Sequence, residues 1–409
     1  MSHHILLRLL RELKIPSRLV KTTAWYLLSL MLPADRHSQT FASKISGLAS
    51  SLFSNLLRKH LHLSRQCLNR ASRRRIKWLM KKRQMLSKNA PWTIALVIDA
   101  TLHERHSKKC QNSQKFTHGK GWVHGHQWTN IGVWVAGEFI PVATIPFYTK
   151  DECRNRKIDY RTENKKVAQW LQTLDLKDLL GRHCSSEIVV LMDSGYDCSK
   201  IYETLKSRKL DFIVGAKNNR SISIDSKKWQ PISQYFQDRR RREKIIRQKS
   251  GDGKKWQRYA VKQQIGYLKG LFPQVNFVSS RRSNTKMKCF ICSNLSVSAG
   301  VAIACYRIRW SIEIFHREIK SHLGLQDTGA HSFDAVHSHV LWVFCSYILL
   351  RELIEPSSGI KRLQQKLECK LRVNEVKSLR QISTQFYSVE KIKAKCLSVI
   401  EEMESRYAA

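Results

Sequence analysis

Two short apolar runs constrain the fold more than any other feature of the sequence. Residues 93–99 read TIALVID and residues 187–193 read EIVVLMD, so each run is rich in apolar residues and ends in an aspartate. Continuous apolar runs of this length are typical of strands that are buried on both faces of a sheet. Aspartate is disfavoured within strands and costly to bury without a partner. Asp99 and Asp193 therefore each require a partner, and a divalent metal ion would supply one.

The segments around these two strands predict an α/β domain. Residues 128–148 predict two strands around a turn at Gly137-Glu138, residues 159–180 predict a helix, and residues 210–216 predict a further strand. The segment 221–295 is rich in Arg, Lys, Gln, Tyr and Trp and contains strand-like pieces, which predicts a basic, β-rich insertion. Helices are expected again from about residue 298.

The N-terminal part has a different pattern. Ile45, Leu48, Leu52 and Leu56 recur at helical spacing, and the charged run SRRRIKWLMKKR follows at 72–83. Such a run is either a solvated helix face or a surface for a polyanion, and the charge of the whole chain favours contact with DNA.

That charge excludes most small-molecule enzymes. The chain has 73 Lys and Arg against 32 Asp and Glu, a net charge of +41 and a pI of about 10.1. Nucleic acid is the expected partner, because phosphate contacts by Lys and Arg release counterions. A membrane surface is the weaker alternative, because the basic residues are spread over several regions. The apolar run at 340–350 is about half as long as a bilayer span, so we expect a buried helix there.

The cysteines and the N-terminus indicate the compartment. Eleven cysteines without regular spacing favour reduced thiols in a cytoplasm. The run at 24–33 lacks the features of a secretory signal. Cys289 and Cys292 have the spacing of half a zinc site, and the histidine-containing stretches at 103–110 and 124–126 could also suggest zinc. Both cysteines fall in a strand-like run, which favours burial over metal binding.

The segment YRIRWSIEIFHREIK at 306–320 carries the most specific pattern. At 100° per residue on a helix, Tyr306, Arg309, Glu313 and Lys320 fall within about one-sixth of the circumference. A separate apolar stripe is formed by Ile308, Ile312, Phe315 and Ile319. Glu318 lies about 180° from Arg309 and is a poor alternative to Glu313. The simplest interpretation is a surface ion pair between Arg309 and Glu313, which would contribute only a few tenths of a kcal/mol.

The spacing Y-x2-R-x3-E-x6-K resembles the signature of bacterial insertion-sequence DDE transposases of the IS-four group, often called the YREK signature. Asp193-Ser194-Gly195-Tyr196 is similar to the second-acid motif of that family, Asp-x-Gly-aromatic. The resemblance covers roughly residues 91–350. It implies a ribonuclease-H-like mixed sheet with flanking helices, interrupted by a β-rich insertion. Asp99 is followed by Ala-Thr where a second acid is frequent in such families, so Glu104 is an alternative first acid.

The resemblance implies a metal-dependent site. Asp99, Asp193 and Glu313 would be the catalytic residues and the ligands of two Mg²⁺ or Mn²⁺ ions, which suit carboxylate oxygens. Arg309, Lys320 and Tyr306 would contact DNA phosphates, and Trp256 would stack on an unpaired or flipped base. Gly195 would let the backbone approach DNA, or it is an ordinary turn glycine.

The expected function is cleavage at transposon ends and strand transfer into target DNA. Its partners would be the terminal inverted repeats, the target DNA and a second copy of the chain, in the cytoplasm at the nucleoid, with no role for a membrane. The alternatives are a ribonuclease-H-like nuclease or resolvase, and a non-catalytic DNA-binding descendant of a transposase. The expected parts are a helical, basic DNA-binding region at 1–90, a catalytic core at 91–220 and 296–358, the insertion at 221–295, and a helical region at 359–409.

Overall fold

The computed structural model describes residues 8, 10–107, 109–119, 121–182, 185–238, 243–249, 256–269, 271–282, 285–354 and 359–372. The chain divides into two compact units. The larger comprises Arg73–His106 and Asn112–His316, and the smaller comprises Met1–Ser72, Ser107–Gln111 and Arg317–Ala409. The predicted basic run at 239–242, residues 250–255 and the predicted helices beyond residue 372 lie outside the described residues. The functional roles assigned to the parts of the chain stay predictions.

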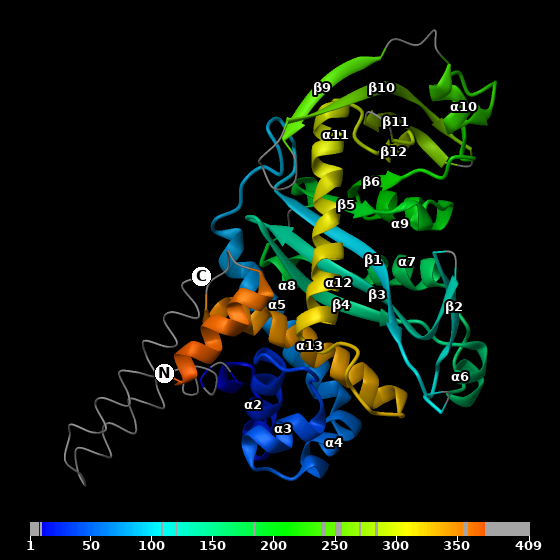
Figure 1. Ribbon diagram of the computed structural model, residues 1–409. Coiled ribbons are helices and arrows are strands. Elements are labelled where there is room, and N and C mark those ends of the chain that lie inside the picture. Colours follow the sequence, from blue (N-terminus) through cyan, green and yellow to red (C-terminus); the bar gives the residue numbers. More distant parts are fainter. Residues whose placement is uncertain are drawn as a thin grey trace. The chain divides into compact units, whose positions relative to one another are not determined.

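The larger unit is built on one mixed sheet (Figure 1). Its first six strands are β1 (Ile94–Glu104), β2 (Gln114–His118), β3 (Gly121–Val135), β4 (Glu138–Pro146), β5 (Ile188–Met192) and β6 (Asp211–Gly215). Strand β1 pairs antiparallel with β3 and parallel with β5, β3 pairs antiparallel with β4, and β5 pairs parallel with β6. This order, β4-β3-β1-β5-β6, is the mixed arrangement expected of a ribonuclease-H-like sheet.

The register of the central strands positions the two aspartates. Ile98 lies opposite Met192 in the parallel β1–β5 pair. Asp99 and Asp193 each follow the paired residue by one position, so the two aspartates lie side by side where β5 ends. Both strands are buried, as the apolar runs predicted.

The strand-rich segment continues this sheet. Its strands are β7 (Ser221–Ser223), β8 (Gln230–Pro231), β9 (Lys244–Lys249), β10 (Trp256–Leu268), β11 (Leu271–Arg282) and β12 (Lys288–Cys292). Strand β12 pairs antiparallel with β6 and with β11, and β10 pairs with β11, β9 and β7. The expected β-rich character is therefore observed, and these strands extend the edge of the central sheet through β6.

Several predicted boundaries shift. The predicted helix at 159–180 is two helices, α7 (Glu163–Thr173) and α8 (Leu176–Leu180), because Asp175 begins a new helix by accepting a hydrogen bond from the Asp178 amide. The β3–β4 turn is at Ala136-Gly137, one residue earlier than predicted, and both turn residues have positive φ. The larger unit also contains α6 (Lys150–Asn155), α9 (Ser199–Ser207), α10 (Ile232–Gln237), α11 (Ala299–Tyr306), the last part of α5 (Leu61–Met80) and the first part of α12 (Trp310–His322).

The smaller unit is helical. Its elements are α2 (Ser17–Met31), α3 (Gln39–Ser46), α4 (Ser50–Lys59), the first part of α5 (Leu61–Met80), the last part of α12 (Trp310–His322), α13 (Phe333–Leu353) and a helical segment at 360–372. The helical spacing predicted through Ile45–Leu56 is interrupted, because Gly47 takes the left-handed conformation that ends α3. Helix α13 is long and apolar enough to cross a membrane, but it is almost completely buried, as the core helix of a soluble protein would be.

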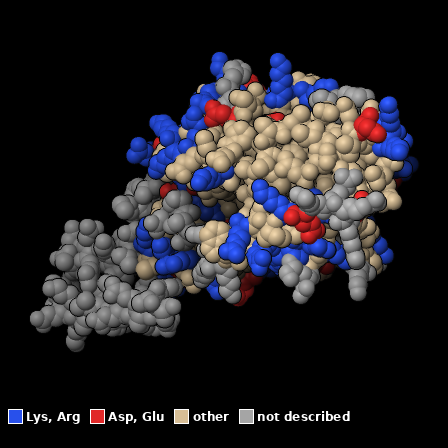
Figure 2. Space-filling model, turned by 90° about the horizontal axis from the view of Figure 1, so that it is seen from above, with Lys and Arg blue, Asp and Glu red and all other residues tan. Residues whose placement is uncertain are grey.

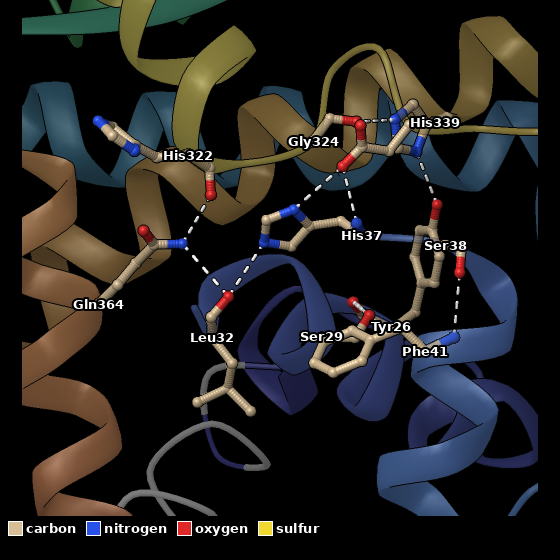
Figure 3. Close-up of polar contacts among 11 residues, drawn as sticks. Tyr26, Ser29, Leu32, His37, Ser38, Phe41, His322, Gly324, His339 and Gln364 are labelled. Carbon is tan, nitrogen blue, oxygen red and sulfur yellow. Dashed lines mark hydrogen bonds and ion pairs between the residues drawn. The ribbon is translucent and has the colours of Figure 1, made fainter. Parts of the chain in front are cut away.

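Buried polar contacts join the N-terminal helices of this unit to its C-terminal helices (Figure 3). The His339 ring contacts the Gly324 carbonyl through Nε2 at 2.8 Å and the Tyr26 hydroxyl through Nδ1 at 2.7 Å. Because a carbonyl only accepts, Nε2 carries a proton, and in the neutral ring the Tyr26 hydroxyl donates to Nδ1. His37 lies between the Asp327 carboxylate and the Leu32 carbonyl. These bonds fix the unit around the buried α13.

Candidate active site

Asp99 lies in a charged and mostly buried environment. It is on β1, opposite Asn130 of β3, and its side chain is 15% exposed. Burial raises the pKa of this carboxyl from 3.8 to about 7. The charge of Arg309 opposes the rise, while the charges of Asp193 and Glu313 add to it. The three predicted acids are therefore close enough to interact electrostatically.

Asp193 is held in a tight turn directly after β5. Its side chain caps the short 3₁₀ helix η2 (Ser194–Tyr196), since Oδ1 accepts a hydrogen bond of 2.8 Å from the Gly195 amide. A Cβ on Gly195 would lie 3.0 Å from that same Oδ1. Gly195 therefore has a local role in the turn, which is the ordinary alternative that the sequence left open.

Arg309 joins two of the three acids. Its guanidinium Nη1 lies 3.3 Å from Asp99 Oδ2, and its Nη2 forms an ion pair with Glu313 Oε1. The side chains of Arg309 and Glu313 are 15% and 29% exposed. The pair between Arg309 and Glu313 is thus present, but it is part of a half-buried cluster that includes an acid 210 residues earlier in the chain.

The predicted single helix through 306–320 is wrong in one respect. Tyr306 ends α11, residues Arg307–Arg309 form the 3₁₀ helix η3, and α12 begins at Trp310. In a 3₁₀ helix, residues three apart eclipse each other. Tyr306 and Arg309 are therefore brought into line more closely than an α-helix would bring them, and the guanidinium carbon lies 5.8 Å from the Tyr306 ring centroid.

Tyr306 reaches toward the turn that follows β5. Burial raises its pKa to about 12, with a further contribution from the charge of Asp193 that the charge of Arg309 opposes. Its ring packs on Phe290 with a centroid distance of 4.5 Å. A Cβ on Gly215 would lie 3.0 Å from the Tyr306 hydroxyl and 3.1 Å from the Ser194 amide. The absence of a side chain at Gly215 therefore makes room for the phenol beside this turn.

The rest of the 306–320 segment carries the predicted apolar stripe and Lys320. Ile312, Phe315 and Ile319 are fully buried, as the apolar stripe predicted, whereas Ile308 is only half-buried. Lys320 is half-buried, and burial lowers its pKa.

The two alternative acids have other surroundings. Glu318 accepts from Arg351 at 3.3 Å and from the Ile360 amide at 3.1 Å, within the smaller unit. Glu104 is exposed at the end of β1, five residues beyond Asp99.

A groove of about 1600 Å³ lies beside these residues. It includes Tyr306 and Arg309, and none of the described residues that line it is acidic. Its other aromatic and basic lining residues are Lys88, Trp134, Arg247, Trp256, Tyr259, Lys288, Phe290, Arg307 and Trp310. The Trp256 side chain is 66% exposed on β10, whereas Trp229 is outside the groove and 37% exposed. On the face drawn in Figure 2, Lys and Arg side chains are also spread around the margin and acidic ones are few.

Apart from Trp256, these other aromatic and basic groove residues were not singled out from the sequence. Lys88, Arg247 and Trp310 come from separate segments, and nothing in the local sequence distinguishes them from other surface residues. Arg247 comes to the groove through the pairing of β9 with β10, and Trp310 through its place at the start of α12.

The donor set suits a hard divalent ion, but the acids are not arranged around one. Among the described residues, no group of three or more His, Cys, Asp or Glu side chains is placed to hold a metal ion. The Arg309 guanidinium instead neutralises Asp99 and Glu313. The carboxylates are nevertheless ligands of a suitable kind, because hard divalent ions prefer oxygen atoms. The charges of Asp193 and Glu313 also help to raise the pKa of Asp99, and a bound cation would reduce this repulsion.

The alternative zinc half-site is not supported by its surroundings. Cys289 and Cys292 are buried in β12, and burial raises the pKa of each thiol to about 12. Among the described residues, no further His, Cys, Asp or Glu side chain is placed with them to complete a metal site.

One family model matches part of the chain. Residues 157–349 match the family described as the transposase DDE domain. The match includes Asp193, Tyr306, Arg309, Glu313 and Lys320, but it begins after Asp99. No curated protein matches the chain. The family match, together with the mixed sheet, supports the interpretation of this part of the chain as a transposase DDE domain.

Proposed function

We propose that the protein is a DDE transposase of the IS-four group, which cuts DNA at the ends of its element and joins the 3′ ends to target DNA. The observation that carries the proposal is the contact of one guanidinium with two carboxylates from distant segments, beside a groove lined by aromatic and basic residues. A cluster of this kind suits a site that handles both metal cations and phosphate anions.

Asp99, Asp193 and Glu313 would hold two Mg²⁺ or Mn²⁺ ions. When bound, such ions activate a water or a DNA 3′-hydroxyl and stabilise the leaving oxygen of an in-line displacement. For Asp99 and Glu313 to act as ligands, Arg309 must release them. A scissile phosphate gives the guanidinium a new partner, which it can bind through a fork of two hydrogen bonds.

The other predicted residues would hold the DNA. Tyr306, Arg309 and Lys320 would contact phosphates next to the scissile bond. Trp256 would stack on a base of the transposon end, since it is exposed in the groove and a base has an apolar face to offer. We also propose that the basic N-terminal region reads the terminal repeats and that two copies of the chain pair the ends, in the cytoplasm at the nucleoid.

The test uses the purified full chain, Mg²⁺ and linear DNA that carries the inverted repeats flanking the gene. We expect the wild type to release the end and to form strand-transfer products, and we expect Asp193→Asn and Glu313→Gln to do neither while still binding the DNA. Glu104→Gln, which replaces the alternative acid on β1, is the matched control and should cleave normally. Unimpaired cleavage by Asp193→Asn would overturn the proposal, and cleavage without joining would favour the nuclease.

A further inference from the structure

Glu163 is a polar residue next to the site that the proposed chemistry does not use. It is the first residue of α7 and half-buried. Its carboxylate accepts hydrogen bonds from three side chains. Oε1 accepts from the Thr129 hydroxyl at 2.9 Å and from the Tyr196 hydroxyl at 2.5 Å, while Oε2 accepts from the Gln127 amide at 2.7 Å.

These donors connect Glu163 to the two segments that carry the candidate acids. Thr129 is on β3, opposite Ala100, the residue after Asp99. Tyr196 closes the η2 turn that Asp193 caps. The next residue of α7, Asn164, donates from Nδ2 to the Gly195 carbonyl at 3.3 Å. Two consecutive residues of one helix therefore contact two consecutive residues of the Asp193 turn.

Tyr196 is well placed to transmit this constraint. It is 3% exposed, and its pKa is raised well above its ordinary value by burial, by Glu163 and by the charges of Asp99 and Asp193. The phenol is therefore a buried neutral donor whose one proton is committed to Glu163. Without that acceptor, a buried hydroxyl loses its partner and Tyr196 has reason to move.

The far side of the same turn is fixed separately. Asp197 is fully buried, and it accepts from the Tyr202 hydroxyl at 2.7 Å and from the Lys217 amide at 2.9 Å. The turn is thus held at Asp197 whatever happens at Glu163. Loss of Glu163 would free only the part between Asp193 and Tyr196, which includes the proposed metal ligand.

We propose that Glu163 is a positioning residue: through Tyr196, and with Asn164 on Gly195, it fixes the turn that presents Asp193 to the site. This inference rests on the proposed function. Glu163 acts through other side chains, so its loss lowers the efficiency of the site without removing any group that touches DNA or metal. Residues that orient metal ligands typically contribute about 10- to 100-fold to activity or metal affinity.

A matched control for the loss of Glu163 is provided by Asp211, in the larger unit. Asp211 is also a half-buried carboxylate with three side-chain donors, since it accepts from Trp92 at 2.8 Å, Ser293 at 2.7 Å and Asn294 at 3.2 Å. It begins β6, whereas Asp99 and Asp193 lie at the other end of the neighbouring strands. Asp211→Ala therefore removes a comparable set of hydrogen bonds away from the site.

The experiment compares Glu163→Ala, which removes the acceptor altogether, with Tyr196→Phe, the double variant and Asp211→Ala in the full chain. Three quantities are measured: the melting temperature, the affinity for end DNA without metal, and the Mn²⁺ concentration that gives half-maximal cleavage. We expect Glu163→Ala and Tyr196→Phe each to raise that Mn²⁺ concentration about 10-fold or more, with DNA affinity unchanged. The double variant should be no worse than either single variant, because both changes break one connection.

The outcomes separate this inference from the proposed function. If the wild type does not cleave end DNA, the proposed function fails and this inference fails with it. If the wild type cleaves and the Glu163 and Tyr196 variants need no more Mn²⁺ than Asp211→Ala, only the inference is overturned. Additive effects in the double variant would likewise overturn the connection through Tyr196.

Discussion

Replacement of Asp99 by asparagine should stabilise the metal-free protein at the expense of its activity. Burial and the neighbouring acids raise the pKa of this carboxyl from 3.8 to about 7. A raised carboxyl pKa means that the folded state binds the proton more tightly than the unfolded state. The ionised carboxylate is therefore destabilising. This destabilisation is absent below pH 3.8, grows between pH 3.8 and 7, and is fully present above pH 7.

The size of the effect follows from the shift. At about 1.4 kcal/mol for each unit of pKa, the rise from 3.8 to about 7 corresponds to about 4 kcal/mol above pH 7 and to less than half of that at pH 5. The side chain is only 15% exposed, so solvent screens little of this. At roughly 2–4 °C per kcal/mol for a unit of this size, Asp99→Asn should melt on the order of 10 °C above the wild type at pH 8.

The assay is a melting curve of the full chain with a chelator present, at pH 5 and at pH 8. The expected result is a positive difference in Tm between variant and wild type that is clearly larger at pH 8. Asp159→Asn is the control, because that side chain is 91% exposed and its replacement should change neither value. A gap of equal size at both pH values, or a less stable Asp99→Asn variant at pH 8, would refute the reasoning.

Three further variants test other parts of the site. Arg309→Ala leaves the Asp99 and Glu313 carboxylates without their shared cation, so Mg²⁺ should raise the Tm of this variant more than that of the wild type; an equal or smaller rise would contradict this assignment. Trp256→Ala should change the free energy of unfolding by less than about 0.5 kcal/mol but weaken binding of end DNA by about 1–3 kcal/mol in a gel-shift titration, whereas Trp229→Ala, outside the groove, should bind normally. Gly215→Ala places a methyl group 3.0 Å from the Tyr306 hydroxyl, so it should slow cleavage about as much as Tyr306→Phe; normal cleavage would show that this approach is unimportant.

The strands and the acids could be predicted because their signals are local. A continuous apolar run predicts a buried strand whatever its partners are. The apolar residues that precede Asp99 and Asp193 do lie in the buried strands β1 and β5. These two aspartates lie next to each other because the parallel register of β1 and β5 pairs Ile98 with Met192. Register depends on contacts between residues about 90 positions apart, which no local pattern specifies.

Other features of the site depend on packing and could not be predicted. The helical spacing correctly placed Arg309 next to Glu313. It did not predict the 3₁₀ turn at Arg307–Arg309, which brings Tyr306 closer into line with Arg309 than an α-helix would. Glu163 carries no motif, and its importance depends on donors from β3 and η2 that meet only in the folded sheet. The contact of Arg309 with Asp99 likewise could not be predicted, because the two residues lie 210 positions apart in the sequence.

The central claim is that Asp99, Asp193 and Glu313 together bind divalent metal at the scissile phosphate. The most direct measurement is a titration of Mn²⁺ into the full chain bound to end DNA, followed by electron paramagnetic resonance of the free ion. The account predicts two bound ions per chain in the wild type, with binding lost or greatly weakened in each of Asp99→Asn, Asp193→Asn and Glu313→Gln and retained in Glu104→Gln. Undiminished binding of both ions after all three acids are replaced would contradict it.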